Sequence, residues 1–160
     1  MLWTSDDPGW AKLRGTILAN HEVISFKSCF PASNVTDDED LLYRKQVYLE
    51  MRDFFDTRPD KLFIVMTPPP LNPANTNREN AKRARQFANW LKSSDYLEGH
   101  PNVACFDLFD VLAQPDNGSV NANMLRSDYR EGDDSHPTVP GYQAAGEALA
   151  RFFCETAAAY

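Results

Sequence analysis

The residues with the clearest capacity for chemistry lie near the C-terminus, in the stretch EGDDSHPTVPGYQAAGEALARFF from Glu131 to Phe153. A neutral imidazole beside a carboxylate is the usual general base for activating a hydroxyl at neutral pH. His136 is therefore the first candidate for catalysis, and Asp133 or Asp134 could bind its second nitrogen and fix its tautomer. The structural alternative is a solvated turn in which Asp134 or Ser135 caps the next helix.

A base needs a nucleophile to act on, and two candidates, Ser28 and Cys29, stand together after the β-rich run EVISFK. Each also has a structural interpretation. The Ser28 hydroxyl could bond the local backbone, and Cys29 could be a small buried packing residue. Asn34, a few residues later, could donate its side-chain N–H to an oxyanion or cap a local turn.

The proline-rich segment TPPPLNP begins at Thr67 and offers a rigid wall for a substrate cleft. Rigid backbone has little freedom left to lose on binding, so Pro69 and Asn72 are predicted to contact substrate. Stiffening of the loop explains the prolines equally well. The chain shows no metal-ligand spacing and no Gly-rich phosphate loop, so neither a metal nor a cofactor is expected.

The elements that must position these residues alternate between helix and strand. Hydrophobic periodicity and capping signals predict them. The expected helices run from Pro8 to about Ala19, from the acidic cluster 37–40 to about Asp56, from a cap at Asn75 or Thr76 through Leu91, over a short turn after Asp107, and from about Thr138 to the C-terminus. The expected strands are 22–28, 61–67 and 102–107.

Strands joined by helical crossovers form a parallel sheet that is covered by helices on both faces. The predicted fold class is therefore α/β, a three-layer α/β/α arrangement formed by a single domain over residues 1–160. In such sheets the reactive groups collect beyond the carboxyl ends of the strands. That rule places 28–34, 67–72 and 107–110 along one edge.

Composition excludes several classes of partner. The net charge is −7, and the densest basic cluster is KRAR at 82–85, so nucleic acid is not expected. The longest apolar run has five residues, 62–66, far below the ~18 needed to span a bilayer, so no membrane partner is expected. The opening MLWTSDDPGW has no signal-peptide pattern, which favours a cytoplasmic location for the chain as written.

The C-terminal stretch resembles the last conserved block of the SGNH, or GDSL-like, hydrolases, with Asp133, His136, Pro137 and Gly141 at the matching positions. Other segments agree in order: EVISFKSCFPASN is similar to the third block, with Asn34 as its oxyanion residue. KLFIVMTPPPLNP and NVACFDLFDVLA resemble the next two strands. The resemblance covers the chain from about residue 22 onward.

This resemblance implies a serine hydrolase that acts on small-molecule or carbohydrate esters, such as short acyl or acetyl esters, by a Ser-His-Asp mechanism. It implies that Asp133 orients His136, that His136 acts as base and then acid, and that Asn34 binds the oxyanion.

The chain departs from the family at its N-terminal side. Family members begin with a strand and a Gly-Asp-Ser or His-His-Ser turn that supplies the nucleophile, and a second strand with a block-two glycine follows. Neither is present, which implies a domain without its N-terminal strands. Either Ser28 or Cys29 could substitute for the family's nucleophile; Ser28 is the candidate if the chain is self-sufficient, and a residue on an absent segment is the candidate if it is not.

The alternative function is a catalytically impaired remnant that serves as an oligomeric or binding module. The family's first strand lies beside the third, so its absence would expose strand 22–28 as an open edge. Open edges pair readily, and a symmetric homodimer through 22–28 is expected.

Overall fold

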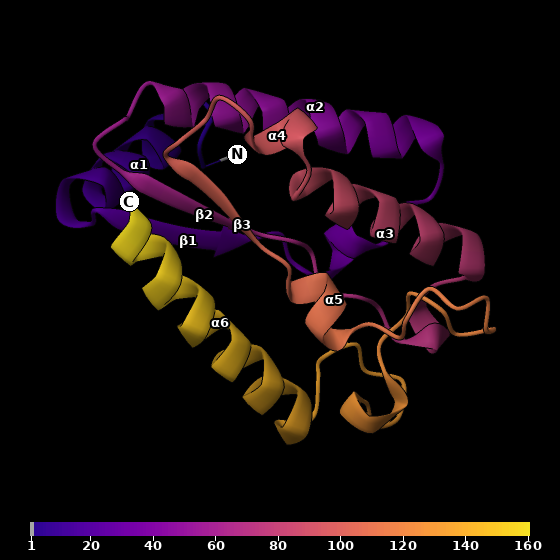
Figure 1. Cartoon of the computed structure of the whole chain (residues 1–160). Helices are drawn as coiled ribbons and strands as arrows, with labels where there is room; N and C mark the ends of the chain where they lie inside the picture. Colours follow the sequence, from indigo (N-terminus) through magenta and orange to yellow (C-terminus); the bar gives the residue numbers. More distant parts are fainter. Residues whose placement is uncertain (1) are drawn as a thin grey trace.

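The computed structural model describes residues 2–160, in which helices and strands alternate along the chain (Figure 1). The elements are α1 (Pro8–Asn20), β1 (Val23–Lys27), α2 (Asp38–Asp56), β2 (Leu62–Met66), α3 (Arg78–Leu91), α4 (Ser94–Leu97), β3 (Val103–Phe106), α5 (Leu108–Leu112) and α6 (Val139–Ala159). Short 3-10 turns lie at Phe30–Ser33, Pro73–Asn75 and Ser127–Tyr129.

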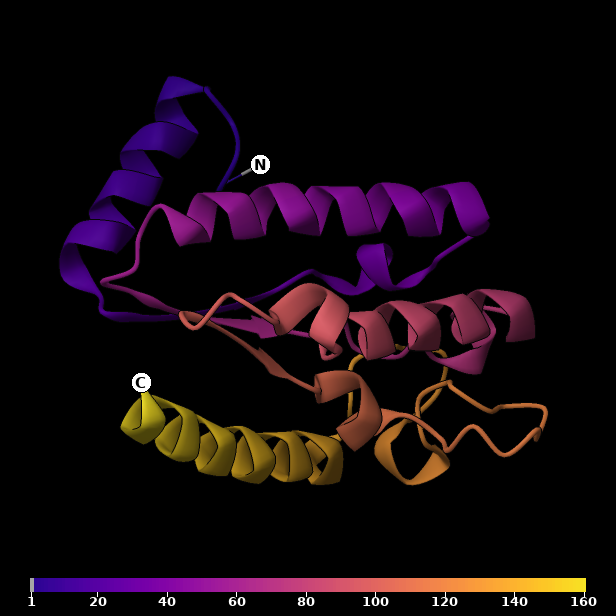
Figure 2. The same ribbon diagram turned by 45° about the horizontal axis from the view of Figure 1, so that its top comes forward.

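The three strands form one parallel sheet in the order β1-β2-β3, with Val23 opposite Leu62 and Phe63 opposite Val103. Helices α2 and α3 cover one face of this sheet, and α6 lies across the other (Figure 2). The predicted α/β class, with its three layers and parallel sheet, is therefore confirmed.

The central strand β2 is buried on both faces, as its continuous apolar sequence predicts. Phe63 and Val65 are fully buried toward the α2 and α3 layer, where the Phe63 ring stacks on Phe55 with centroids 4.1 Å apart. Leu62 and Ile64 point the opposite way and pack with α5 and α6. Alternation of side chains along a strand thus divides the core into two clusters.

Two local features differ from the sequence prediction. The cap of α3 is Asn77, not Asn75 or Thr76, and its side chain accepts a hydrogen bond from the backbone of Asn80. The reason is that Asn72 caps the 3-10 turn Pro73–Asn75, which delays the helix start. Helix α4 was not expected, because a four-residue helix has too few positions to show periodicity.

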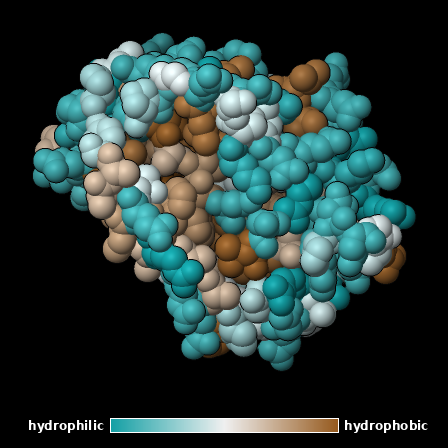
Figure 3. All heavy atoms as spheres, viewed as in Figure 1, coloured by the Kyte–Doolittle hydropathy of each residue, from teal (hydrophilic) through white to brown (hydrophobic). Residues whose placement is uncertain are grey.

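Helix α6 rests on the sheet through one stripe only. It has 21 residues, and Gly141 is its buried member. In Figure 3 the surface between α6 and the α2 layer is hollowed and mostly brown to tan, whereas the surrounding surface is largely teal. A hollow beside α6 is lined by residues of β3, α5 and α6, both apolar, such as Phe106 and Phe152, and charged, such as Arg151. None of the helices within residues 2–160 has the length and apolarity needed to cross a membrane.

The start of α6 depends on close packing at Gly141. A Cβ at this position would lie 2.7 Å from Cβ of Pro137 and 3.1 Å from Cβ of Tyr129. Pro137 and Tyr129 are held together at the start of α6, because the backbone N–H of Thr138 donates to the carbonyl of Tyr129. There is no room here for any side chain.

We expect Gly141→Ala to lower the free energy of unfolding by about 1–3 kcal/mol, since overpacking forces the helix away from its neighbours. Gly146→Ala is the matched control, because a Cβ there meets nothing within 4 Å. Alanine is the better helix former, so the control should gain about 0.5–1 kcal/mol. Urea denaturation measures both, and a Gly141→Ala protein as stable as the parent would contradict the packing account.

Candidate active site

The loops that follow β1 and β2 meet the loop that precedes α6 at the carboxyl ends of the strands. Asn72 makes the central contacts: its Nδ2 donates to the carbonyls of Gly132 (3.0 Å) and Asp134 (2.9 Å), and its backbone N–H donates to Oγ of Ser135 (3.0 Å). Asn75 adds hydrogen bonds from its Nδ2 to the carbonyl of Asp133 and to Oγ of Ser135. The segment after β2 therefore holds the histidine loop in place.

His136 is bound by a carboxylate, but the residue is Asp134 and not the expected Asp133. Oδ1 of Asp134 lies 2.8 Å from Nδ1 of His136 and accepts the backbone N–H of His136 at 3.0 Å. An Asp that bonds the backbone two residues onward closes a tight turn, and this turn also brings its carboxylate to the ring. The side chain of Asp133 has no hydrogen bond in the part of the chain that the structure describes, whereas its carbonyl binds Asn75.

The hydrogen bond from the backbone N–H of His136, followed by that from its ring, holds the pKa of Asp134 below its usual range. The carboxylate therefore stays ionised at neutral and mildly acidic pH, where it can fix the ring. With Nδ1 engaged, the histidine has Nε2 left for a reacting group; this nitrogen makes no hydrogen bond within residues 2–160.

The His136 ring stands at a groove of about 410 Å³ on the α6 side of the sheet. The ring packs edge-on against Phe30, with centroids 4.5 Å apart. Pro69 is among the residues that line this groove, and its contact with a substrate stays a prediction. The other lining residues are mostly apolar: Lys27, Cys29, Phe30, Met66, Phe106, Leu108, Leu112, Pro137, Tyr142, Ala145, Gly146 and Leu149.

The candidate nucleophile Ser28 lies on the opposite face of the sheet, which corrects the sequence prediction. Its Oγ is 2.5 Å from the hydroxyl of Tyr48 on α2, and it lines a separate hollow with residues of that helix. Successive side chains point to opposite faces along an extended chain. Lys27 and Cys29 therefore face the His136 groove, and Ser28 faces away from it.

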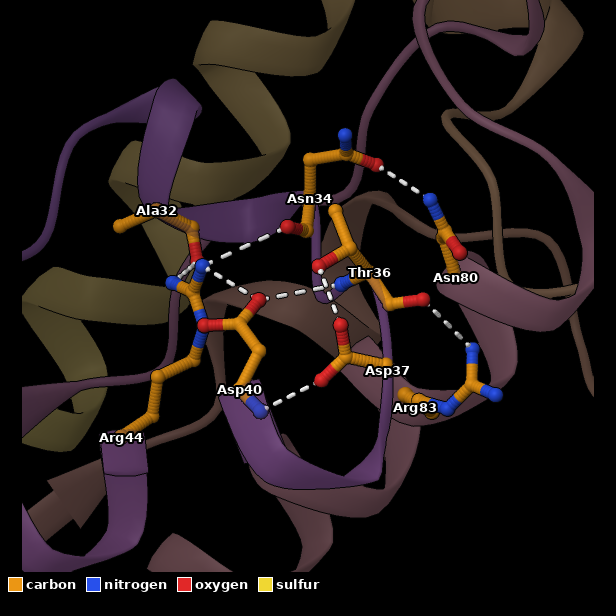
Figure 4. A network of polar contacts seen from close by, with 8 residues as sticks. All are labelled: Ala32, Asn34, Thr36, Asp37, Asp40, Arg44, Asn80 and Arg83. Carbon is orange, nitrogen blue, oxygen red and sulfur yellow. Dashed lines mark hydrogen bonds and ion pairs between the residues drawn. The ribbon is translucent and has the colours of Figure 1, made fainter. Parts of the chain in front are cut away.

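Asn34 lies beside the start of α3 with its side-chain amide in a defined orientation (Figure 4). Its Oδ1 accepts from Nδ2 of Asn80 (3.0 Å) and from Oγ1 of Thr76 (3.3 Å). Its own Nδ2 makes no hydrogen bond to the residues that the structure describes, so it is available as a donor. Thr76 follows Asn75 directly, and this short segment joins Asn34 to the histidine loop.

Arg44 of α2 fixes the backbone around Asn34 (Figure 4). Its guanidinium donates to the carbonyls of Ala32 and Asn34 and forms an ion pair with Asp40 at 2.9 Å. Partial burial opposes ionisation of Asp40, but hydrogen bonds from Arg44 and from the backbone of Thr36 outweigh it and hold the pKa of this carboxyl below its usual range. The ion pair therefore persists into mildly acidic conditions.

Asn72 proves to be a positioning residue, not part of the groove wall that was predicted. Its side chain is buried, 3% exposed, and its hydrogen bonds go to the protein's own loop. Sequence reasoning also missed Asn75 and Phe30. An Asn pair flanking Pro73 could have signalled a capped turn, but nothing in the sequence indicates that Phe30 touches the histidine. The described residues contain no cluster of three or more His, Cys, Asp and Glu that could hold a metal.

Replacing Asn72 with Ala should lower the free energy of unfolding by about 1–3 kcal/mol, because the carbonyls of Gly132 and Asp134 lose their buried donor. Hydrogen exchange should rise in the 132–136 loop. Asn20→Ala at the exposed end of α1 is the control, and it should change neither quantity appreciably. An unaltered exchange pattern in Asn72→Ala would show that the loop does not depend on this amide.

The chain matches no protein-family model and no curated protein. Among solved structures it is similar to a Streptococcus pneumonia protein provisionally described as a platelet activating factor, with a TM-score of 0.56 and 14% sequence identity. The match covers 86% of this chain and 66% of that one, so this chain corresponds to less than two thirds of the length of its neighbour. The likeness establishes the shared fold, a parallel sheet between two layers of helices.

Proposed function

We propose that this chain is an esterase-type hydrolase in which His136 is the general base. The supporting observation is the pairing of Nδ1 of His136 with Asp134, which leaves Nε2 without a hydrogen bond to the described residues in a histidine that lines an apolar groove. A carboxylate in this position fixes the tautomer and stabilises the imidazolium that forms when the base takes a proton. Asp134 takes over the orienting role first given to Asp133.

The reaction has two proton transfers at one nitrogen. Nε2 of His136 removes the proton of the attacking group, and the imidazolium then protonates the leaving oxygen of the ester. Asn34 is not among the residues that line the groove, so its side-chain N–H as the donor to the oxyanion on the carbonyl oxygen stays the sequence prediction. Its orientation by Asn80 and Thr76 supports this role, since an oriented donor needs no rearrangement during the reaction.

The groove supports a substrate with a short apolar acyl group, including the acetyl group of a carbohydrate ester. Pro69, Leu108 and Leu112 contribute rigid or apolar walls, and the space of about 410 Å³ suits a small acyl chain.

Substitutions of Asp133 and Asp134 test which of the two aspartates orients His136. Hydrolysis of p-nitrophenyl acetate should be lost in His136→Gln and fall about 10-fold or more in Asp134→Asn, because the ring loses its orienting acceptor. Asp133→Asn is the matched control and should stay near the parent rate. Equal rates in Asp134→Asn and Asp133→Asn would show that Asp134 has no part in the mechanism. A His136→Gln protein that hydrolyses the ester at the parent rate would overturn the proposal.

A binding or oligomeric role is the second candidate function, and the free edge of β1 favours it. Within residues 2–160, β1 pairs on one side only, with β2. The N–H of Leu62 donates to the carbonyl of Glu22, so alternate residues of β1 face β2 and the backbone of Ser25 faces the open edge. A second copy could pair there antiparallel and produce a symmetric homodimer.

Light scattering at micromolar concentration should then give twice the mass of one chain. Ser25→Pro should reduce it to the monomer mass, since proline removes an outward N–H and leaves the ladder to β2 intact. Ser25→Ala keeps the N–H and should remain dimeric. A parent protein with the mass of one chain would end the edge-pairing hypothesis.

A further inference from the structure

We infer that Cys29 is the nucleophile of the His136 groove. The inference rests on the proposed function, because it supplies the attacking group that His136 activates. It replaces Ser28, whose hydroxyl is bonded to Tyr48 on the other face of the sheet.

The residues at the end of β1 and just after it face alternate sides of the sheet. Lys27 and Cys29 both line the groove, and Ser28 between them lines the hollow beside α2. This alternation continues the two-residue period of β1 for two residues past its end at Lys27, which places Cys29 on the groove side and Ser28 on the α2 side. Cys29 is exposed, which sets aside its interpretation as a buried packing residue.

Residues close to Cys29 in the sequence lie near each other and near His136. Phe30 follows it directly, and the ring of Phe30 lies 4.5 Å from the ring of His136. Nζ of Lys27 is 5.3 Å from the centre of the same Phe30 ring. The Phe30 ring therefore contacts the imidazole of His136 and lies near the ammonium group of Lys27, and Cys29 lines the same groove as these three residues.

The three cysteines of the described chain occupy different surroundings. Cys154 is exposed on α6 and is not among the residues that line the groove. Cys105 on β3 is partly buried, and burial raises the pKa of its thiol to about 12. Cys29 is thus the exposed cysteine that lines the same groove as His136, and Cys154 is an internal reference for exposure alone.

The chemistry is acyl transfer through a thioester. Nε2 of His136 takes the thiol proton, the sulfur forms a bond to the ester carbonyl carbon, and the C–O bond breaks as the imidazolium protonates the departing alcohol. A water molecule then gives its proton to His136 and attacks the thioester carbon. The C–S bond breaks, the acid departs, and the thiolate recovers the proton.

The first experiment compares two thiols in one molecule. The full chain is treated briefly with iodoacetamide, and the alkylated peptides containing Cys29 and Cys154 are quantified by mass spectrometry. His136→Gln should slow alkylation of Cys29 roughly 10-fold and leave Cys154 unchanged, because the base is lost at one thiol only. His21→Gln, an exposed histidine beside the start of β1, should alter neither rate.

Cys154 also reports on folding, since a general collapse of the variant would change its rate too. A rate at Cys29 that is the same with and without His136 would overturn the inference. If His136→Gln changes both thiols, the test is repeated with His136→Asn, and the ratio of the Cys29 rate to the Cys154 rate decides.

The second experiment traps the acyl group. After incubation with p-nitrophenyl acetate, the acetyl group should be found on Cys29, should be released by hydroxylamine at neutral pH, and should be absent from Cys29→Ala but present in Cys154→Ala. Hydrolysis that survives in Cys29→Ala and is lost in His136→Gln overturns the inference and leaves the proposed function standing. Acetylation of Cys29 that depends on His136 but is not followed by turnover supports the inference and overturns the proposed function.

Discussion

The buried amide of Asn72 is the interaction on which the candidate site depends. Two backbone carbonyls and one hydroxyl of the histidine loop, at Gly132, Asp134 and Ser135, are bound by the side chain and backbone of this single residue. An unsatisfied buried amide would be costly, so the loop and the end of β2 cannot separate without losing several hydrogen bonds at once. The position of His136 is therefore fixed relative to the sheet, because the segment that follows β2 binds the loop that carries the histidine.

The layer order and the sheet topology could be predicted from the sequence because they follow from local patterns. The apolar run of β2 indicates burial on both faces, and the acidic cluster before α2 indicates a helix start that Asp37 indeed caps. The location of His136 before the last helix was predictable for the same reason. Short elements such as α4 were not, because their few residues carry no period.

The roles of individual site residues could not be predicted to the same extent, because they depend on directions and not on order. Sequence places Asp133 and Asp134 equally near the histidine, and the tight turn at Asp134 decides between them. Likewise, Asn72 and Pro69 follow the same strand, but one is buried in the loop and the other lines the groove. The burial of Asn72 depends on hydrogen bonds between segments about sixty residues apart, which a sequence pattern does not reveal.

The alternation after β1 means that the chemistry of the groove depends on a count of residues. Ser28 and Cys29 differ in their reactive atom and are adjacent, so the number of residues between the paired start of β1 and the groove decides which of the two lines the groove. Deleting one residue from β1 would turn the Ser28 hydroxyl toward His136 and the Cys29 thiol toward Tyr48. Under the proposed mechanism, the length of β1 would therefore determine whether the acyl intermediate is an oxygen ester or a thioester.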